Sequence, residues 1–247
     1  MRRNRSDDGA KSDREAAGRF RVEVRNALKA AAEPERAPAM QAYMKSAMRF
    51  YGVPSPALKK ALKPIFDAHR VDTFEAWTTT ALDLWRNAEA REERYAALRF
   101  CEHRYYKAFH TFDALPMYEE MIVTGAWWDY VDWIAGGRLG PILDKDPVRM
   151  KKTMRAWAKG DALWKARSAI LCQLKAKDTI DLKLLYDCIE PSLSSKEFFL
   201  RKAIGWALRQ HAKTDAEEVY RYVVRKKDVL SGLSKREALK NTDYAIP

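Results

Sequence analysis

The sequence predicts an all-helical protein, and three observations lead to this prediction. Apolar residues recur at three- and four-residue spacing through most of the chain, for example over 95–100 and 198–208. No segment alternates apolar and polar side chains as a half-buried strand does. Only 10 Gly and 10 Pro interrupt the 247 residues, so the segments between breaks have ordinary helix lengths. With 47% hydrophobic residues, the chain can bury a substantial core.

Residues that interrupt helices divide the chain into successive segments. The first 20 residues are charged and nearly free of large apolar side chains, which predicts a flexible arm or a frayed helix before a single domain over 21–247. Two helical patterns follow and end at Val53-Pro-Ser-Pro56, because a proline disfavours helix in the residue before it. The second of them begins near Ala39. Later breaks are predicted at Gly136-Gly137, Gly140-Pro141, Asp146-Pro147 and Pro191.

A weak periodicity points to a more specific architecture. Similar small and apolar residues surround four positions that are 36, 36 and 34 residues apart, namely Leu98, Ile134, Ile170 and Ile204. This period suits stacked helical hairpins, whose inner helices would line one common surface. An antiparallel helical bundle repeats about as often, so the spacing leaves both architectures open.

Composition excludes several classes of protein. No run approaches the roughly 20 apolar residues of a membrane span, and the charged start Met1–Asp8 lacks the apolar part of a secretory signal. We therefore expect a soluble, cytoplasmic protein. Its three cysteines are odd in number and far apart, and its four histidines show no ligand spacing, which predicts neither a disulfide nor a metal site. Gly136–Gly140 does not follow a strand pattern and is not a dinucleotide-binding loop.

Positive charge is concentrated in the C-terminal part of the chain. The formal net charge is +12, and residues 149–240 hold 22 Lys and Arg against 11 Asp and Glu, whereas the rest holds 24 against 23. Such an asymmetric distribution attracts polyanions, of which nucleic acid is the commonest large one in a cell. A well-solvated basic surface is the alternative interpretation.

The segment 124–135 places two carboxylates among three tryptophans. Trp128 and Asp132 are four residues apart and share a helix face. A carboxylate among aromatic rings is costly to desolvate and needs a partner or a cationic ligand, although a structural ion pair would also satisfy it. Asp129 lies about a hundred degrees round the helix from Trp128, and we expect it to have a structural role such as capping the first helix amides. Six tryptophans are expected in the core: Trp77, Trp85, Trp127, Trp133, Trp157 and Trp164.

Three segments together resemble the bacterial AlkD-like DNA alkylation repair glycosylases. They are Trp127-Trp-Asp-Tyr-Val-Asp132, Trp164-Lys-Ala-Arg-Ser-Ala-Ile170 and Ser194-Ser-Lys-Glu-Phe-Phe-Leu-Arg-Lys-Ala-Ile-Gly-Trp206, and the ending 233–240 fits as well. The likeness extends from about Tyr43 to Lys240.

The resemblance implies a right-handed superhelical solenoid of HEAT-like helical-hairpin repeats with a concave DNA-binding groove. It implies a base excision repair glycosylase that hydrolyses the N-glycosidic bond of N3- or N7-alkylated purines, such as 3-methyladenine and 7-methylguanine, in duplex DNA and without a cofactor. Asp132 matches the catalytic carboxylate, Trp128 and Trp206 the aromatic walls beside the lesion, and Arg167 the cationic partner. We expect a monomer.

These residue types suit that chemistry. An alkylated purine is cationic and leaves with little need for a general acid, so charge grows on the sugar, where a carboxylate can stabilise it and orient water. Arg167 would either clamp a phosphate or form an ion pair with Asp132, and from the sequence we favour the phosphate. Candidate backbone binders are Arg201, Lys202, Arg209, Lys213, Lys235 and Arg236.

Two other functions stay open at this point. A helical-repeat scaffold could bind nucleic acid or protein without catalysis, and it would give Asp132 no chemical role. An adaptor for single-stranded RNA or acidic peptides could use the same basic half. The presence of Asp132 favours the enzyme.

Overall fold

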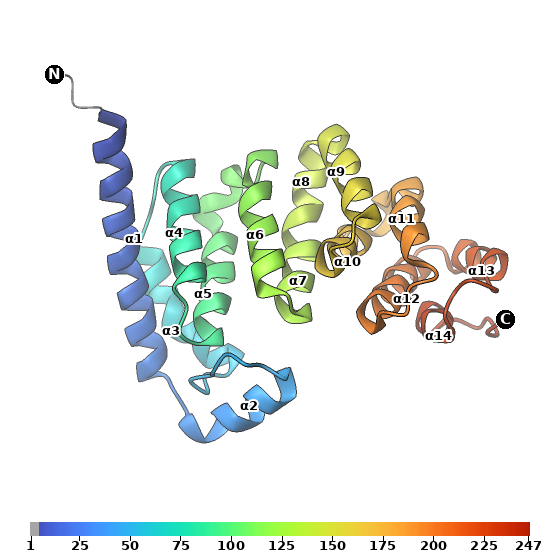
Figure 1. The fold of residues 1–247 in the computed structure, drawn as a ribbon, viewed down its shortest axis with the longest axis horizontal. Coiled ribbons are helices and arrows are strands. Elements are labelled where there is room, and N and C mark those ends of the chain that lie inside the picture. The colour runs from blue at the N-terminus through green and yellow to red at the C-terminus, as the bar shows by residue number, and fades with distance from the viewer. Residues whose placement is uncertain (1–4) are drawn as a thin grey trace. The chain divides into compact units, whose positions relative to one another are not determined.

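The computed structural model describes residues 5–247, with side chains described from residue 9 onward. This part of the chain forms 14 α-helices with short 3-10 turns, one π-helical segment and no strand (Figure 1). The all-helical prediction is therefore confirmed. Within residues 5–247, no helix combines the length and the apolar character that crossing a membrane requires.

The chain divides into two compact units, Met1–Phe109 and His110–Pro247. In the first unit, α1 packs against α3, α4 and α5. The described helices of this unit are α1 (Arg5–Ala30), α2 (Ala37–Met44), α3 (Ser55–Ala68), α4 (Phe74–Arg86) and α5 (Arg91–Glu102). The predicted helix near Ala39 corresponds to α2, and the predicted break at residues 53–56 corresponds to the start of α3.

Helix α1 runs unbroken through residue 20, where the sequence predicts the arm to end. Ala17 and Phe20 are buried, and the Phe20 ring lies 5.8 Å from that of Phe66 and 5.3 Å from that of Phe100. Packing against the first unit thus begins before the predicted boundary. Residues 1–4 of the arm lie outside the described residues, and the arm's flexibility and the single domain stay predictions.

A buried carboxylate holds the loop before α3. Glu92 is fully buried and accepts hydrogen bonds of 2.9–3.1 Å from the backbone N–H groups of Tyr51, Gly52 and Val53. Gly52 has a φ of +87°, which side chains rarely adopt, and a Cβ there would lie 2.0 Å from the Glu33 carbonyl oxygen. The loop therefore requires glycine at this position.

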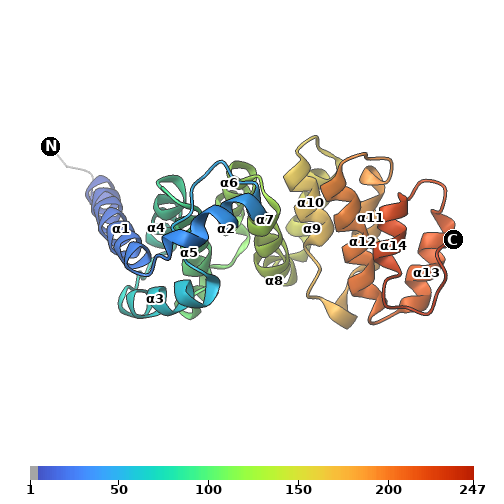
Figure 2. The same ribbon diagram turned by 90° about the horizontal axis from the view of Figure 1, so that it is seen from below.

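The second unit contains the helices that carry the candidate site. Helix α10 contacts α7, α9 and α12, and α12 contacts α14 (Figure 2). The helices are α6 (Leu115–Gly125), α7 (Trp128–Ile134), α8 (Gly140–Lys145), α9 (Pro147–Lys159), α10 (Leu163–Leu171), α11 (Leu182–Ile189), α12 (Phe198–Ala212), α13 (Ala216–Arg225) and α14 (Gly232–Ala238).

The four periodic positions fall in four helices. Leu98, Ile134, Ile170 and Ile204 lie in α5, α7, α10 and α12, and each is at most 3% exposed. In the second unit, α7 contacts α10 and α10 contacts α12, so three of these positions are buried in successive contacting helices. The solenoid of HEAT-like repeats and its concave groove stay predictions.

The predicted break at Gly136-Gly137 is wrong, because the helix continues there in a wider form. Ala135–Leu139 is a π-helical segment, η4, that joins α7 directly to α8. A Cβ at Gly136 would contact the Leu174 side chain at 3.5 Å, and one at Gly140 would lie 2.9 Å from the Cys172 carbonyl oxygen. These glycines allow close packing against the end of α10 rather than a turn.

The structure predicts that Gly52→Ala destabilises the protein. The left-handed backbone alone costs about 1 to 3 kcal/mol with a side chain, and the contact with the Glu33 carbonyl adds to it. Urea unfolding measures the change. Gly18→Ala is the matched control, because a Cβ there meets nothing within 4 Å in α1, and it should stabilise the protein by about 0.5 to 1 kcal/mol. Equal stability of Gly52→Ala and wild type would contradict the account of this loop.

Candidate functional site

A sharp turn places Trp128 and Asp132 on the short helix α7. Helix α6 ends at Gly125, the next residue, Ala126, has a left-handed φ of +42°, and Trp127 then precedes α7 in extended backbone. Trp128 is the first residue of α7, and Asp132 follows one turn later. Asp129 lies in the first turn, where the helix dipole favours a negative charge, and its structural role stays a prediction.

Asp132 forms a bidentate ion pair with Arg167 of α10. Arg167 Nε lies 2.7 Å from Asp132 Oδ1, and Nη2 lies 2.7 Å from Oδ2. Nη1 donates to the carbonyl oxygen of Phe199 at the start of α12. Arg167 therefore joins α7, α10 and α12, and its side chain is only 4% exposed.

This geometry corrects the role that the sequence favours for Arg167. A phosphate clamp needs an accessible guanidinium, but all three nitrogens of Arg167 are engaged and the residue is buried. The structure shows the other use, an ion pair with Asp132. Burial of Arg167 is what decides between the two, and it depends on tertiary packing.

Opposing effects act on the Asp132 carboxyl. Burial raises the pKa of Asp132, and the hydrogen bonds and charge of Arg167 lower it. The nearby charge of Asp129 raises the pKa further, and the net direction is upward. Because an arginine stays protonated, Arg167 favours the charged carboxylate in a site that otherwise disfavours it.

Three aromatic rings pack against one another, and one of them, Phe199, lies beside Arg167. The ring centroids of Trp127 and Trp164 are 6.1 Å apart, and the Phe199 ring lies 5.5 Å from Trp127 and 4.9 Å from Trp164. The Arg167 guanidinium carbon lies 5.8 Å from the Phe199 ring centroid. In the described part of the chain, the buried indole nitrogen of Trp127 has no hydrogen-bond partner. The sequence did not single out Phe199, whose only signal is its place in the 194–206 motif.

The core assignments of the tryptophans are confirmed in part. Trp77, Trp85 and Trp157 are at most 5% exposed. Trp127, Trp133 and Trp164 are only half-buried, so their assignment to the core is wrong. Two of these three belong to the aromatic cluster with Phe199, and Trp133 lies under the Arg138 guanidinium at 5.2 Å.

Trp128 and Trp206 are half-buried on α7 and α12. Among residues 5–247, neither indole has a ring neighbour or a hydrogen-bond partner. The structure therefore does not join them to the Asp132–Arg167 pair by a direct contact, and their indoles remain available to a ligand.

The six predicted backbone binders gather on two contacting helices. Arg201, Lys202 and Arg209 lie on α12, Lys213 follows its last residue, and Lys235 and Arg236 lie on α14, which packs against α12. The structure therefore brings together cations from two separate segments of the sequence.

Most of these cations already have partners. Arg201 donates to the Ser195 carbonyl at 2.8 Å, and Lys213 to the Gln210 amide oxygen at 3.0 Å. Lys202 and Arg209 both pair with Glu237, each at 2.6 Å. Lys235 donates to two backbone carbonyls at 2.9 and 3.3 Å, and Arg236 is exposed.

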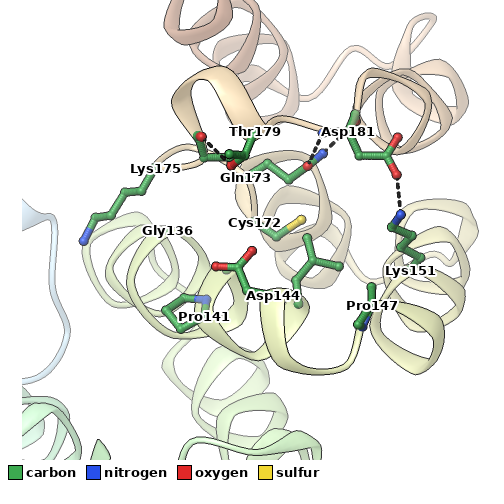
Figure 3. Close-up of a pocket in the computed structure, with 13 residues that line it drawn as sticks. Gly136, Pro141, Asp144, Pro147, Lys151, Cys172, Gln173, Lys175, Thr179 and Asp181 are labelled. Atoms are coloured by element: carbon green, nitrogen blue, oxygen red, sulfur yellow. Dashed lines mark hydrogen bonds and ion pairs between the residues drawn. The ribbon is translucent and has the colours of Figure 1, made fainter.

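A separate cavity of about 360 Å³ lies beside η4 (Figure 3). Lys151 pairs with Asp181 at 2.7 Å on its wall, and Gln173 exchanges hydrogen bonds with the backbone of Asp181. None of the predicted site residues lines this cavity. In the part of the chain that the structure describes, no three His, Cys, Asp or Glu side chains are grouped so as to hold a metal ion.

Comparisons with known proteins identify the family. A solved structure described as a predicted DNA alkylation repair enzyme from Enterococcus faecalis matches with a TM-score of 0.77 and 27% sequence identity, covering 87% of this chain and 98% of that one. No curated protein matches the chain. The family model for the DNA alkylation repair enzyme matches residues 24–242. Because this match spans most of the sequence, the chain belongs to the DNA alkylation repair enzyme family.

Proposed function

We propose that this protein is a DNA glycosylase that hydrolyses the N-glycosidic bond of cationic N3- and N7-alkylated purines in duplex DNA and leaves an abasic site. The observation that carries the proposal is the Asp132 carboxylate, half-buried on α7 and held through both oxygens by Arg167. Membership of the DNA alkylation repair enzyme family supports a substrate in alkylated DNA.

The carboxylate stabilises the reaction where charge develops. Alkylation at N3 or N7 makes the purine a good leaving group, and positive charge moves to the deoxyribose as the bond breaks. Asp132 stabilises that oxocarbenium-like sugar and orients a water toward its C1′ atom. Arg167 fixes both carboxylate oxygens before DNA arrives, so little reorganisation is needed during the reaction.

The indoles of Trp128 and Trp206 contact the lesion. The face of an indole attracts a cation and packs on deoxyribose without needing hydrogen bonds, which suits Trp128 and Trp206. The basic residues of α12 and α14 bind phosphates, and such contacts position DNA without reading its sequence. Neither metal nor cofactor takes part, and the enzyme acts as a monomer.

Asp132→Asn should abolish most of the activity. Loss of one preorganised group that stabilises a transition state costs roughly a hundred- to a thousandfold in rate. Release of free 7-methylguanine from a methylated duplex under single-turnover conditions measures it. Asp161→Asn, at an exposed carboxylate between α9 and α10, is the matched control and should keep the wild-type rate. If the wild-type protein binds the duplex but releases no base, the protein would be a non-catalytic scaffold instead.

The pH dependence of base release should follow the protonation of Asp132, which Arg167 influences. Arg167→Gln removes the cation that lowers the pKa of Asp132, so this pKa should rise. As the pH falls, the variant should therefore lose activity at a higher pH than the wild-type protein does. Asp129→Asn removes a charge that raises this pKa, so its midpoint should move to lower pH. The single-turnover rate, corrected for spontaneous loss of base, gives both midpoints. Identical profiles for both variants and wild type would exclude Asp132 as the titrating group.

The indoles should contribute through their attraction for positive charge. Trp206→Leu removes a cation–π contact worth about 0.5 to 2 kcal/mol, which corresponds to a rate of base release about 2- to 30-fold lower. Trp206→Phe keeps an aromatic face and should lose less. Single-turnover rates at saturating enzyme separate this effect from duplex affinity. Equal losses in the two variants would show that Trp206 acts through its volume alone.

A further inference from the structure

One carboxylate engages two of the basic residues on α12. Glu237 of α14 accepts from Lys202 Nζ and from Arg209 Nη1, each at 2.6 Å. The Glu237 side chain is 13% exposed, whereas those of Lys202 and Arg209 are 40% and 23% exposed. The Glu237 carboxylate therefore lies beneath the side chains of Lys202 and Arg209, which reach solvent.

Close packing of α14 on α12 fixes the position of Glu237. A Cβ at Gly205 would lie 2.4 Å from the Glu237 Cβ and 2.9 Å from the Ser234 carbonyl oxygen, so only glycine allows this approach. The Ser234 hydroxyl is buried and donates to the Arg201 carbonyl at 2.9 Å. Glu237 is thus held against α12 by the packing around it and not only by its charge.

The two cations flank Trp206. Positions 202, 206 and 209 are four and three residues apart and share one face of α12, whereas Gly205 lies to the other side of the two cations. Helix α14 covers the Gly205 side, and Trp206 has no ring or hydrogen-bond partner among the described residues. Lys202 and Arg209 therefore lie on both sides of an indole that the proposed function places against DNA.

Glu237 is charged at neutral pH. The hydrogen bond from Lys202 and the charges of Lys202 and Arg209 lower the pKa of Glu237, against a smaller opposing effect of burial. The three side chains together carry one net positive charge instead of two. A carboxylate and a phosphate offer the same kind of charged oxygen acceptor to Lys and Arg.

We propose that Glu237 is an internal competitor for DNA phosphate: it occupies Lys202 and Arg209 in the free protein, and duplex DNA binds more weakly because it must share or displace these contacts. This proposal rests on duplex binding by the proposed glycosylase. It assigns Glu237 a role in setting affinity, which leaves the chemistry to Asp132.

Glu237→Gln tests the proposal, since it keeps the shape of the side chain and removes its charge. The variant raises the net charge of the three side chains by one, which corresponds to about one more phosphate contact, so the slope of log affinity against log salt should steepen by about 0.9, and affinity should rise roughly five- to tenfold at about 0.1 M salt. Fluorescence anisotropy with an undamaged duplex, over a series of KCl concentrations, gives both quantities.

Glu217→Gln is the matched control. Glu217 is an exposed carboxylate of α13 that pairs with Arg221 at 3.2 Å, so this variant changes the net charge equally but frees no residue of α12. The affinity gained by Glu237→Gln must exceed the gain in this control. Equal gains would overturn the proposal, and weaker binding by Glu237→Gln would show instead that Glu237 positions the two cations for DNA.

A second variant, Lys202→Gln, gives one measurement in the wild-type background, where Glu237 and the packing of α14 are unchanged, and a loss of more than about fivefold there would by itself overturn the proposal. Lys202→Gln should weaken duplex binding less than about twofold in the wild-type background but roughly five- to tenfold in the Glu237→Gln background, because only there is Lys202 free. Equal effects in both backgrounds would overturn the proposal. Thermal unfolding of all variants identifies any loss of α14 packing.

The two proposals fail in different ways. A wild-type protein that releases 7-methylguanine while Glu237→Gln binds no more tightly than Glu217→Gln would retain the glycosylase and reject the role of Glu237. If the wild-type protein binds duplex without releasing base, and the Glu237→Gln variant binds duplex more tightly, the glycosylase would be rejected and the role of Glu237 retained. Absence of duplex binding at low salt would reject both.

Discussion

The buried ion pair between Asp132 and Arg167 is the interaction on which the second unit of this protein depends. It joins α7 to α10, and the third guanidinium nitrogen bonds the Phe199 carbonyl of α12. Removing either partner would leave an uncompensated buried charge, which costs several kcal/mol and far exceeds the value of an exposed pair. The same contact therefore fixes the packing of three helices and the position of the carboxylate.

The π-helical segment continues α7 into α8, and Gly136 and Gly140 let this stretch of helix approach the end of α10. Gly140 approaches the Cys172 carbonyl so closely that a side chain would collide with it, and Cys172 ends the helix that carries Arg167. Helix α10 is thus joined to α7 by the ion pair and to the start of α8 by this backbone contact. π-helical segments are rare and occur often at functional sites, and here one directly follows α7, the helix that carries Asp132.

The sequence predicted local features of the molecule well and contacts between distant residues poorly. Helical periodicity gave the fold class, and the four-residue spacing of Trp128 and Asp132 placed both on α7. The pairing of Asp132 with Arg167 spans 35 residues, so burial of the guanidinium could not be read from either segment, and the phosphate role was favoured instead. Glu237 was overlooked because a single acid in a basic region has no local signal.

Exposure separates the two kinds of ion pair in this site. The side chain of Arg167 is 4% exposed, so exchanging its carboxylate for a phosphate would require α7, α10 and α12 to separate. Lys202 is 40% exposed and pairs with a carboxylate below it, so it can turn toward a phosphate with little change in packing. Burial thus commits Arg167 to Asp132, whereas exposure leaves Lys202 and Arg209 able to exchange partners, as the proposed binding of DNA requires. In the proposed enzyme, affinity can then change through Glu237 without disturbing the Asp132 carboxylate.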